Sequence, residues 1–338
     1  MSITASSSAP KSRRRLSRII VSVSIFVIIA GAGAWAVLNR QNIIDQITVW
    51  QFNMPSAVAA LADDSGMSVR GKFVFHASRP ELNDHVAFNQ NCEMRESQAV
   101  ILGCFAGGRI FIFNVTDPRI YGIRTVTAAH EMLHAAYARL SASERKKVDR
   151  LLEKQFERTT DQTLLDLIEI YEKAEPGQKL NELHSLFGTE VSDLDSELEA
   201  YYEKYFADRA RVVTIYQEYH QVFADLSAEV SALEKQLESE SRAIAAALAE
   251  HEKGTSELAA DITEFNNCAD TLNCFASQAA FDRARAALMT RQAKLKETAD
   301  QINAQVEKYN AGVADLNALG IEAKRLNQSI DSHAPTIE

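Results

Sequence analysis

The chain has 338 residues, enough for about two domains, and its 46% hydrophobic and 24% charged residues are typical of folded proteins. The first 40 residues contain six basic side chains and no acidic one, so the rest of the chain holds 30 basic against 46 acidic side chains. An overall surface with this excess of negative charge repels a phosphate backbone, which argues against nucleic acid as a partner.

The amino-terminal segment has the composition of a membrane anchor. A basic tail over residues 1–18 precedes Ile19–Leu38, twenty residues without a charge. As a helix this run would span about 30 Å, the hydrocarbon thickness of a bilayer. The small residues of AWA at 34–36 also fit a signal-peptide cleavage site, but the apolar run is longer than in a typical signal peptide. Because five basic residues precede the run and only Arg40 closely follows it, we expect a single-pass anchor with the amino terminus in the cytoplasm. The bulk of the chain would then lie outside, in the periplasm or the extracellular space.

The four cysteines fall into two local pairs, Cys92 with Cys104 and Cys268 with Cys274. An even number of cysteines in close pairs, outside the cytoplasm, indicates two disulfides that close short loops. Zinc binding through them is disfavoured because neither pair has the two-residue spacing of a zinc knuckle. The predicted disulfides and the predicted anchor agree on an oxidising compartment.

Residues 45–205 are expected to form an α+β domain that is mostly helical with a small β-sheet. Short runs of β-branched and aromatic residues, such as GKFVFHA at 71–77 and RIFIFNV at 109–115, indicate strands. From Thr125 onward the apolar residues recur with the period of a helix. We also expect RIFIFNV to expose an edge on which an extended peptide could pair through its backbone.

Residues 206–332 have the pattern of an antiparallel coiled-coil hairpin. The predicted seam of the second arm consists of Leu288, Leu295, Ala299, Ile302, Val306, Tyr309, Val313 and Leu316. A weaker seam runs from Leu226 to Leu248 in the first arm, and the second cysteine pair lies in the tip between the arms. The hairpin is either a self-packed spacer or an arm that docks a partner protein or gates a substrate.

The segment VTAAHEMLHAAYARL, at 126–140, reads as one amphipathic helix with the pattern H-E-x-x-H. His130 and His134 are four positions apart, so both imidazoles lie on one face, about 6 Å apart, and can bind one tetrahedral Zn²⁺. Glu131 lies next to that face, where its carboxylate can take the proton of a water that attacks a carbonyl group polarised by zinc. The alternative is a helix whose histidines are merely packed or solvated.

A catalytic zinc site needs a third protein ligand and one open position. Tyr137 and Leu140 occupy the positions at which a longer H-E-x-x-H-x-x-G-x-x-H pattern would place its glycine and third histidine, so the ligand must come from further along. The best candidate stretch is KLNELHSLFGTEVSDL, which offers Glu182, His184 and Glu190. A carboxylate that does not bind the metal could instead bond to one of the ligating histidines.

The H-E-x-x-H helix together with NELHSLFGTEV resembles the gluzincin, or thermolysin-like, zinc metallopeptidases. In these enzymes a downstream helix supplies a glutamate ligand that often follows an asparagine, and Asn181 and Glu182 match that pair. The resemblance implies a zincin-like catalytic domain with Glu182 as the third ligand. The segment after Ser185 is one residue shorter than the thermolysin pattern, and the interval from His134 to Glu182 is longer, so Glu190 stays open as the ligand.

A tyrosine or histidine opposite the metal usually helps to hold the charge that develops on the substrate oxygen. The candidates for this role are His184, Tyr201 and Tyr202. Each of them has an alternative interpretation as a core residue, because aromatic side chains at helical spacing are more often buried.

The sequence therefore predicts a membrane-anchored zinc metallopeptidase that hydrolyses peptide bonds of envelope proteins. Zn²⁺ would be held by His130, His134 and either Glu182 or Glu190, and Glu131 would act as the general base. Two other functions are kept open: a coiled-coil envelope scaffold with a non-catalytic metal site, and a zinc hydrolase that acts on peptidoglycan.

Overall fold

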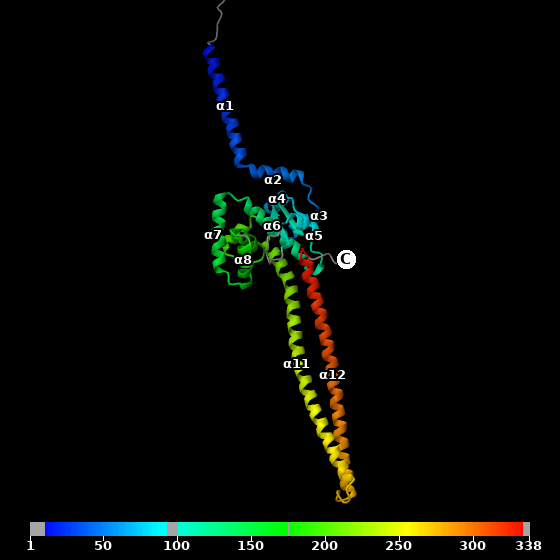
Figure 1. Ribbon diagram of the computed structural model, residues 1–338. Helices are drawn as coiled ribbons and strands as arrows, with labels where there is room; N and C mark the ends of the chain where they lie inside the picture. Colours follow the sequence, from blue (N-terminus) through cyan, green and yellow to red (C-terminus); the bar gives the residue numbers. More distant parts are fainter. Residues whose placement is uncertain (1–10, 93–100, 175, 334–338) are drawn as a thin grey trace, which may run out of the picture. The chain divides into compact units, whose positions relative to one another are not determined.

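The computed structural model describes residues 11–92, 101–174 and 176–333, with no description of the side chains at 11–20, 23 and 174. The chain divides into two compact units (Figure 1). The first comprises the described parts of Met1–Glu218 and Asp331–Glu338, and the second is Tyr219–Ile330.

The first unit has a mostly helical α+β fold with one small sheet. Its helices are α1 (Lys11–Leu38), α2 (Arg40–Gln51), α3 (Ser56–Asp64), α4 (Val69–Ala77), α5 (His85–Asn91), the 3-10 helix η1 (Pro118–Ile120), α6 (Gly122–Ala138), α7 (Ala142–Arg158), α8 (Gln162–Ala174), α9 (Lys179–Thr189), α10 (Ser196–Tyr202) and the start of α11 (Arg209–Ala269). Its strands are β1 (Glu81–Asn83), β2 (Gly103–Ala106) and β3 (Arg109–Phe113). The predicted fold class is confirmed at this level.

The sheet has the strand order β1-β3-β2, with β1 parallel and β2 antiparallel to β3. The run RIFIFNV does form a strand, β3, and its residues 110–113 are buried. Our expectation of a free edge on this run is wrong, because Phe111 is paired with Glu81 on one side and with Cys104 on the other. The two terminal strands of the described sheet are β1 and β2, and α6 packs against β2 and β3.

The run GKFVFHA is helical rather than extended, so the strand that we expect there is wrong. It lies in α4, whose first turn is capped by the Ser68 side chain accepting a hydrogen bond from the Gly71 amide. Val74 and Phe75 are completely buried, and Gly71 and Ala77 are also buried, which is one helical face rather than an alternating strand pattern. Tertiary burial and the cap outweigh the β-propensity of the aromatic residues.

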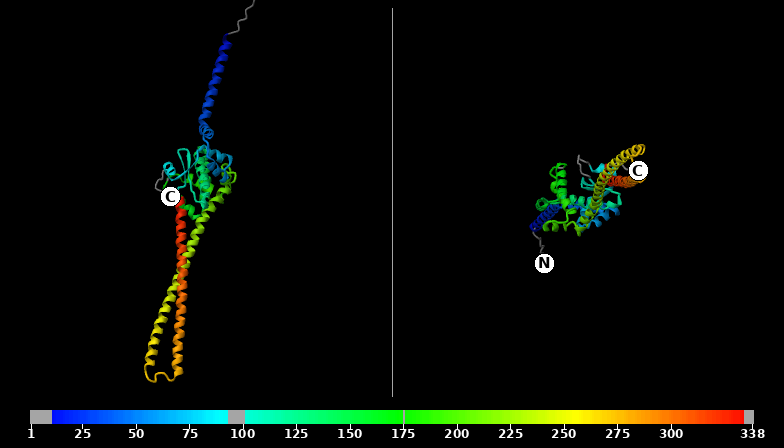
Figure 2. Two further views of the ribbon diagram at one scale, coloured as in Figure 1. Left: turned by 90° about the vertical axis from the view of Figure 1, so that its right-hand side faces the viewer. Right: turned by 90° about the horizontal axis from the view of Figure 1, so that it is seen from below.

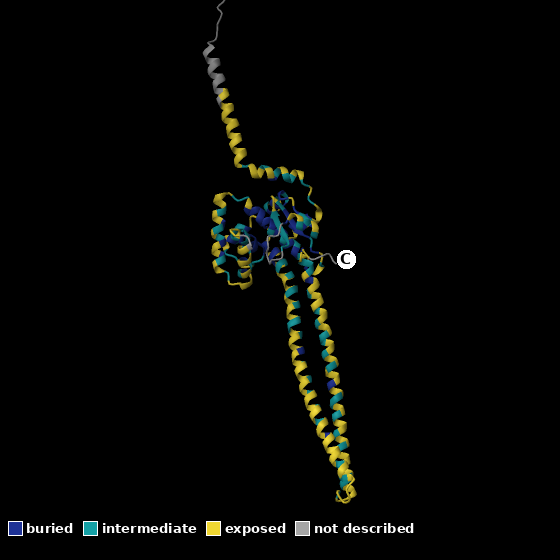
Figure 3. Cartoon of the chain, viewed as in Figure 1, coloured by how far each residue is buried: buried dark blue, intermediate teal, exposed yellow. Residues whose placement is uncertain are grey.

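Helix α6 is the centre of the core of the first unit (Figure 3). It packs against β2, β3, α3, α4 and α9, and its Ala128, Ala129, Met132 and Leu133 are completely buried. Alanines on this face keep the helix close to its neighbours. The H-E-x-x-H segment is therefore held rigidly from several sides.

A buried ion pair joins α2 to the end of α6. Asp45 is 1% exposed and accepts two hydrogen bonds of 2.9 Å from the guanidinium group of Arg139. A third hydrogen bond runs from Arg139 to the carbonyl oxygen of Ala135. This bidentate geometry fixes both side chains where α2 meets the end of α6.

The amino-terminal helix α1 exposes large apolar side chains along its described length, among them Phe26, Ile28, Val37 and Leu38. In the described part of the chain, no helix by itself has the length and apolarity required to cross a membrane. Ser24–Leu38 and Arg40–Gln51 satisfy that requirement only as a pair, and the pair is bent by 73°.

The second unit consists of α11 from Tyr219 onward and α12 (Gln278–Ile330), which run side by side in opposite directions (Figure 2). Gly312 lies against Leu237, and Gly254 lies against Leu295. Ion pairs across the helices join Lys308 to Glu240, and Arg291 to Glu257 and Asp261. All the predicted seam residues of the second arm are buried or half-buried. The antiparallel hairpin is present, whereas its coiled-coil packing stays a prediction.

Both predicted disulfides are present. Cys92 is bonded to Cys104, which ties β2 to the end of α5, and Cys268 is bonded to Cys274 at the tip of the hairpin. No free cysteine remains among the described residues. Each bond closes a short loop and so restricts the unfolded chain.

Replacing Asp45 by alanine should destabilise the first unit by about 3 kcal/mol, because the buried guanidinium group of Arg139 would lose its counter-charge. Asp64→Ala is the control, because Asp64 is exposed on α3 and should change the free energy of unfolding by less than about 0.5 kcal/mol. Amide hydrogen exchange in α6 across a urea series measures both effects. Equal unfolding of the two variants would contradict a stabilising role for the pair.

Candidate metal centre

Two of the predicted ligands lie on one face of α6. The ring centroids of His130 and His134 are 4.8 Å apart, as expected for positions separated by one helical turn. The side chains are 15% and 10% exposed, so each ring is largely buried but still reachable from solvent. The helix is fixed around them by the completely buried Ala129 and Leu133.

The third member of the group is Glu182, in the first turn of α9. Its Oε2 atom lies 3.7 Å from Nε2 of His130 and 3.6 Å from Nε2 of His134. Two ligands at about 2.0–2.1 Å from a tetrahedral metal would lie about 3.4 Å apart. The observed separations are close to that value, and the three ligand atoms all lie within 4.8 Å of one another. The group could therefore hold a metal ion.

The electrostatic surroundings favour the ligand form of Glu182. Burial alone would raise the pKa of this carboxyl group, but the neighbouring imidazoles of His134 and His130 outweigh burial and hold the pKa below its usual value. The carboxylate is thus ionised at neutral pH and directed at the two imidazoles. A metal cation bound between the three groups would likewise favour the ionised form of Glu182.

Glu131 is buried beside this group and has no ligand role in it. Burial raises the pKa of Glu131 to about 7, with His134 lowering it and Glu182 raising it. Its Oε2 atom has no hydrogen-bond partner among the described residues. Such an unsatisfied buried carboxyl oxygen is costly in a purely structural position, which makes it a candidate for chemistry.

Strand β2 passes directly over Glu131 at Gly103. A Cβ atom at Gly103 would lie 2.7 Å from Oε1 of Glu131 and 2.5 Å from Cγ2 of Thr127. Only glycine allows the strand to come this close without displacing the carboxylate. Sequence reasoning missed Gly103, for which the only signal was a glycine next to a predicted disulfide cysteine.

Glu190, the other carboxylate considered as a ligand, caps the carboxyl end of α9 and lies outside the ligand group. Burial raises the pKa of Glu190 to about 7, while His130 and a hydrogen bond from Tyr216 lower it and Glu182 raises it. Tyr216, near the start of α11, was not singled out from the sequence, and no pattern around it pointed to this contact. The structure thus brings Glu182, rather than Glu190, between the histidines.

The three residues considered for holding charge on the substrate oxygen contact one another in the core. His184 is completely buried, with its Nε2 atom 2.9 Å from the Tyr201 hydroxyl, and its carbonyl oxygen accepts a 2.7 Å hydrogen bond from Tyr202. Burial and, to a smaller extent, His134 lower the pKa of His184 to about 3, so this imidazole is neutral. None of the three belongs to the ligand group, and a catalytic role for them stays a prediction.

The donor set of two imidazole nitrogens and one carboxylate oxygen is suited to divalent transition metals. No family model, curated protein or solved structure that was compared with the chain matches it. The function of this centre therefore has to be inferred from its own residues.

The raised pKa of Glu131 predicts a pH dependence of stability in the metal-free chain. The unfolded chain releases the proton of Glu131 near pH 4.5, whereas the folded chain keeps it up to about pH 7. Stability should therefore fall as pH rises through this window and level off above it. Glu131→Gln cannot ionise, so its stability advantage over the wild type should grow between pH 4.5 and 7.

The measurement is urea unfolding of both chains, stripped of metal, at several pH values. Glu157→Gln is the control, since Glu157 is exposed on α7 and should follow the wild type. A constant difference between Glu131→Gln and the wild type across the window would contradict the raised pKa.

Proposed function

We propose that the chain is a zinc-dependent metallopeptidase, held at a membrane by its amino-terminal segment, that hydrolyses peptide bonds of envelope proteins. The observation that supports it best is the convergence of His130, His134 and Glu182 beside the buried, unsatisfied carboxyl group of Glu131. A site that only stabilised the fold would not need that fourth group.

Zinc is the metal that we propose for the group. Catalytic zinc sites use three protein ligands and keep a fourth position open, and two histidines with one glutamate are such a set. Glu182 follows Asn181 in the sequence, as in the gluzincin pattern that this segment resembles. Zinc bound here would polarise the substrate carbonyl group and lower the pKa of a water molecule at the site.

Glu131 is the proposed general base. Its pKa of about 7 in the metal-free chain lies close to neutral pH, at which a carboxyl group can both accept and return a proton. A nearby cation would lower this pKa and favour the basic form. The carboxylate would accept the proton of the attacking water and then deliver it to the leaving amine nitrogen.

The strand β2 is the proposed support for the substrate backbone. It is one of the two terminal strands of the described sheet, and Gly103 brings it against Glu131. An extended peptide that paired with this edge would run past the ligand group by ordinary strand addition. We therefore propose β2 instead of β3 as the strand on which a peptide pairs, because β3 has no free edge.

Membrane attachment is proposed from α1 and the residues around it. The described side chains of α1 are exposed and, apart from Ser22 and Ser24, apolar, and five basic residues precede the apolar run in the sequence. Basic residues on this side favour a cytoplasmic amino terminus. The two disulfides support an extracytoplasmic position for the rest of the chain.

The proposed ligand set predicts that the full-length chain binds one Zn²⁺ with His130, His134 and Glu182. Glu182→Gln should weaken zinc binding by about 100-fold or more, because a ligand oxygen loses its charge. Glu190→Gln is the matched control at the carboxyl end of the same helix and should bind zinc like the wild type. Isothermal titration of the stripped, detergent-solubilised chains measures the affinities, and loss of zinc in Glu190→Gln alone would make Glu190 the ligand.

Glu131→Gln should lower kcat/KM for peptide hydrolysis by about 10²- to 10⁴-fold while zinc stays bound, because the general base is lost. Glu157→Gln, an exposed change of the same chemistry, should keep full activity. The assay uses an unfolded protein and peptidoglycan fragments, with mass spectrometry to identify the bond that is cut. Zinc binding without any hydrolysis that depends on Glu131 would favour the scaffold function, and cleavage of peptidoglycan alone would favour the cell-wall hydrolase.

A further inference from the structure

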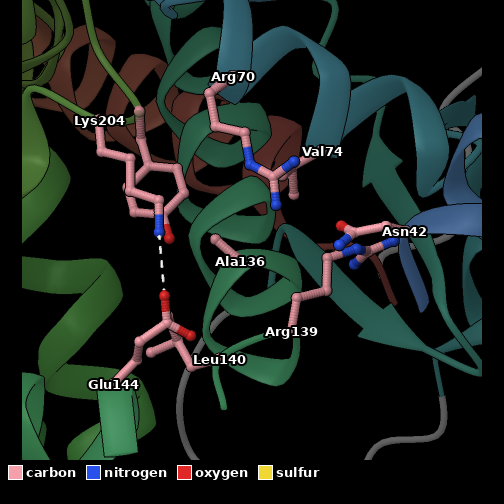
Figure 4. Close-up of a pocket in the computed structure, with 9 residues that line it drawn as sticks. Asn42, Arg70, Val74, Ala136, Arg139, Leu140, Glu144 and Lys204 are labelled. Carbon is pink, nitrogen blue, oxygen red and sulfur yellow. Dashed lines mark ion pairs between the residues drawn. The ribbon is translucent and has the colours of Figure 1, made fainter. Parts of the chain in front are cut away.

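A polar cavity with a volume of about 140 Å³ lies in the first unit, apart from the metal-ligand group. It is lined by Asn42, Arg70, Val74, Ala136, Arg139, Leu140, Glu144, Lys204 and Tyr205 (Figure 4). Since a water molecule in the liquid occupies about 30 Å³, this volume suits a few waters or one small polar group. The metal-ligand group contributes no residue to it.

The cavity lies on the side of α6 that faces away from the two histidines. Ala136 follows His134 by two positions, which turns it by about 200° around the helix axis. Relative to His130 it is turned by about 240° in the same sense. A ligand in this cavity would therefore be separated from the metal centre by the body of α6.

Three cationic side chains and one carboxylate line the cavity. Figure 4 shows Arg70 reaching into the space between Lys204 on one side and Arg139 and Asn42 on the other. Lys204 is paired with Glu144 at 3.8 Å, and Arg139 is paired with the buried Asp45 behind it. Arg70 also lowers the pKa of the Glu144 carboxyl group, so Arg70 and Lys204 share this one carboxylate and one positive charge is left in excess.

Arg70 is half-buried, and its guanidinium group donates no hydrogen bond to any side chain or carbonyl group that the structure describes. It lies over the ring of Phe73 at 5.4 Å and interacts electrostatically with Glu144. The Oε2 atom of Glu144 already accepts hydrogen bonds from the side chain and amide of Ser141, so this carboxylate does not use all the donors of Arg70. A guanidinium group carries five donors in a planar fork, so an anion that enters here finds several unused donors.

The carboxyl end of α6 does not oppose an anion at this position. Its last carbonyl groups are already occupied: that of Ala135 accepts from Arg139, and that of Tyr137 accepts from Arg145. Two positive side chains thus cover the negative end of the helix dipole. The cavity is a local exception to the negative charge of the chain as a whole.

We propose that this cavity binds a phosphate group, with Arg70 as the main donor and Lys204 and Asn42 as further donors. The planar guanidinium fork matches two phosphate oxygens, and lysine adds a point charge. Asn42 lies on α2, which directly follows the proposed membrane segment and exposes Ile44, Ile47 and Trp50. The phosphate can therefore come from a soluble ion or from a lipid headgroup, and the experiment separates these sources.

The test titrates full-length chain in maltoside micelles with inorganic phosphate, at constant ionic strength and with a chelator that keeps the metal centre empty. Isothermal titration should give saturable binding to the wild type. Arg70→Gln should weaken binding by about tenfold or more, because charge-assisted hydrogen bonds are lost. Arg211→Gln is the matched control, since Arg211 is exposed on α11 outside the cavity, and it should bind phosphate like the wild type.

A second series replaces inorganic phosphate with monomeric dihexanoyl phosphatidylglycerol. Tighter binding of the lipid than of phosphate, again lost in Arg70→Gln, identifies a headgroup site, and binding of phosphate alone identifies a soluble ligand. Lys204→Gln repeats the comparison if Arg70→Gln does not fold by circular dichroism. The proposal is overturned if neither compound binds the wild type, or if the cavity variants bind as tightly as the Arg211→Gln control.

Discussion

The metal-ligand group depends on one close contact between two helices. A Cβ atom at Gly188 of α9 would lie 2.3 Å from Cδ1 of Leu133 of α6, so only glycine allows the helices to come this near. Leu133 directly precedes His134, and Gly188 lies six positions after Glu182. The close packing of α9 against α6 therefore also brings Glu182 near the two histidines. Chemistry and packing share the same pair of helices, and a larger side chain at Gly188 would disturb both.

The parts of the site that the sequence could predict are those set by short-range geometry. His130 and His134 share a face because of helical spacing alone, and both disulfides join cysteines that are neighbours in the chain. The choice between Glu182 and Glu190 as the third ligand could not be made from short-range geometry. It depends on how α9 lies across α6, which is set by tertiary packing that no local pattern encodes.

The two errors in the fold have the same origin. GKFVFHA has the residue types of a strand, but the cap from Ser68 and the burial of Val74 and Phe75 against the rest of the domain favour a helix. RIFIFNV is a strand, yet one edge of it is covered by β1, whose residues pair in parallel with residues thirty positions further along the chain. Parallel pairing needs a crossover connection, and its partner cannot be read from the strand itself.

The register of the hairpin has a consequence for how its length can vary. From Leu237 to Gly254 in α11 is seventeen residues, and from Gly312 back to Leu295 in α12 is also seventeen. The two arms therefore advance residue for residue, and an insertion in one arm alone would misplace every glycine and ion pair beyond it. Equal insertions or deletions of a heptad in both arms would keep all partners matched and move the disulfide-closed tip by about 10 Å. The length of the hairpin can therefore change only by equal insertions or deletions in both arms.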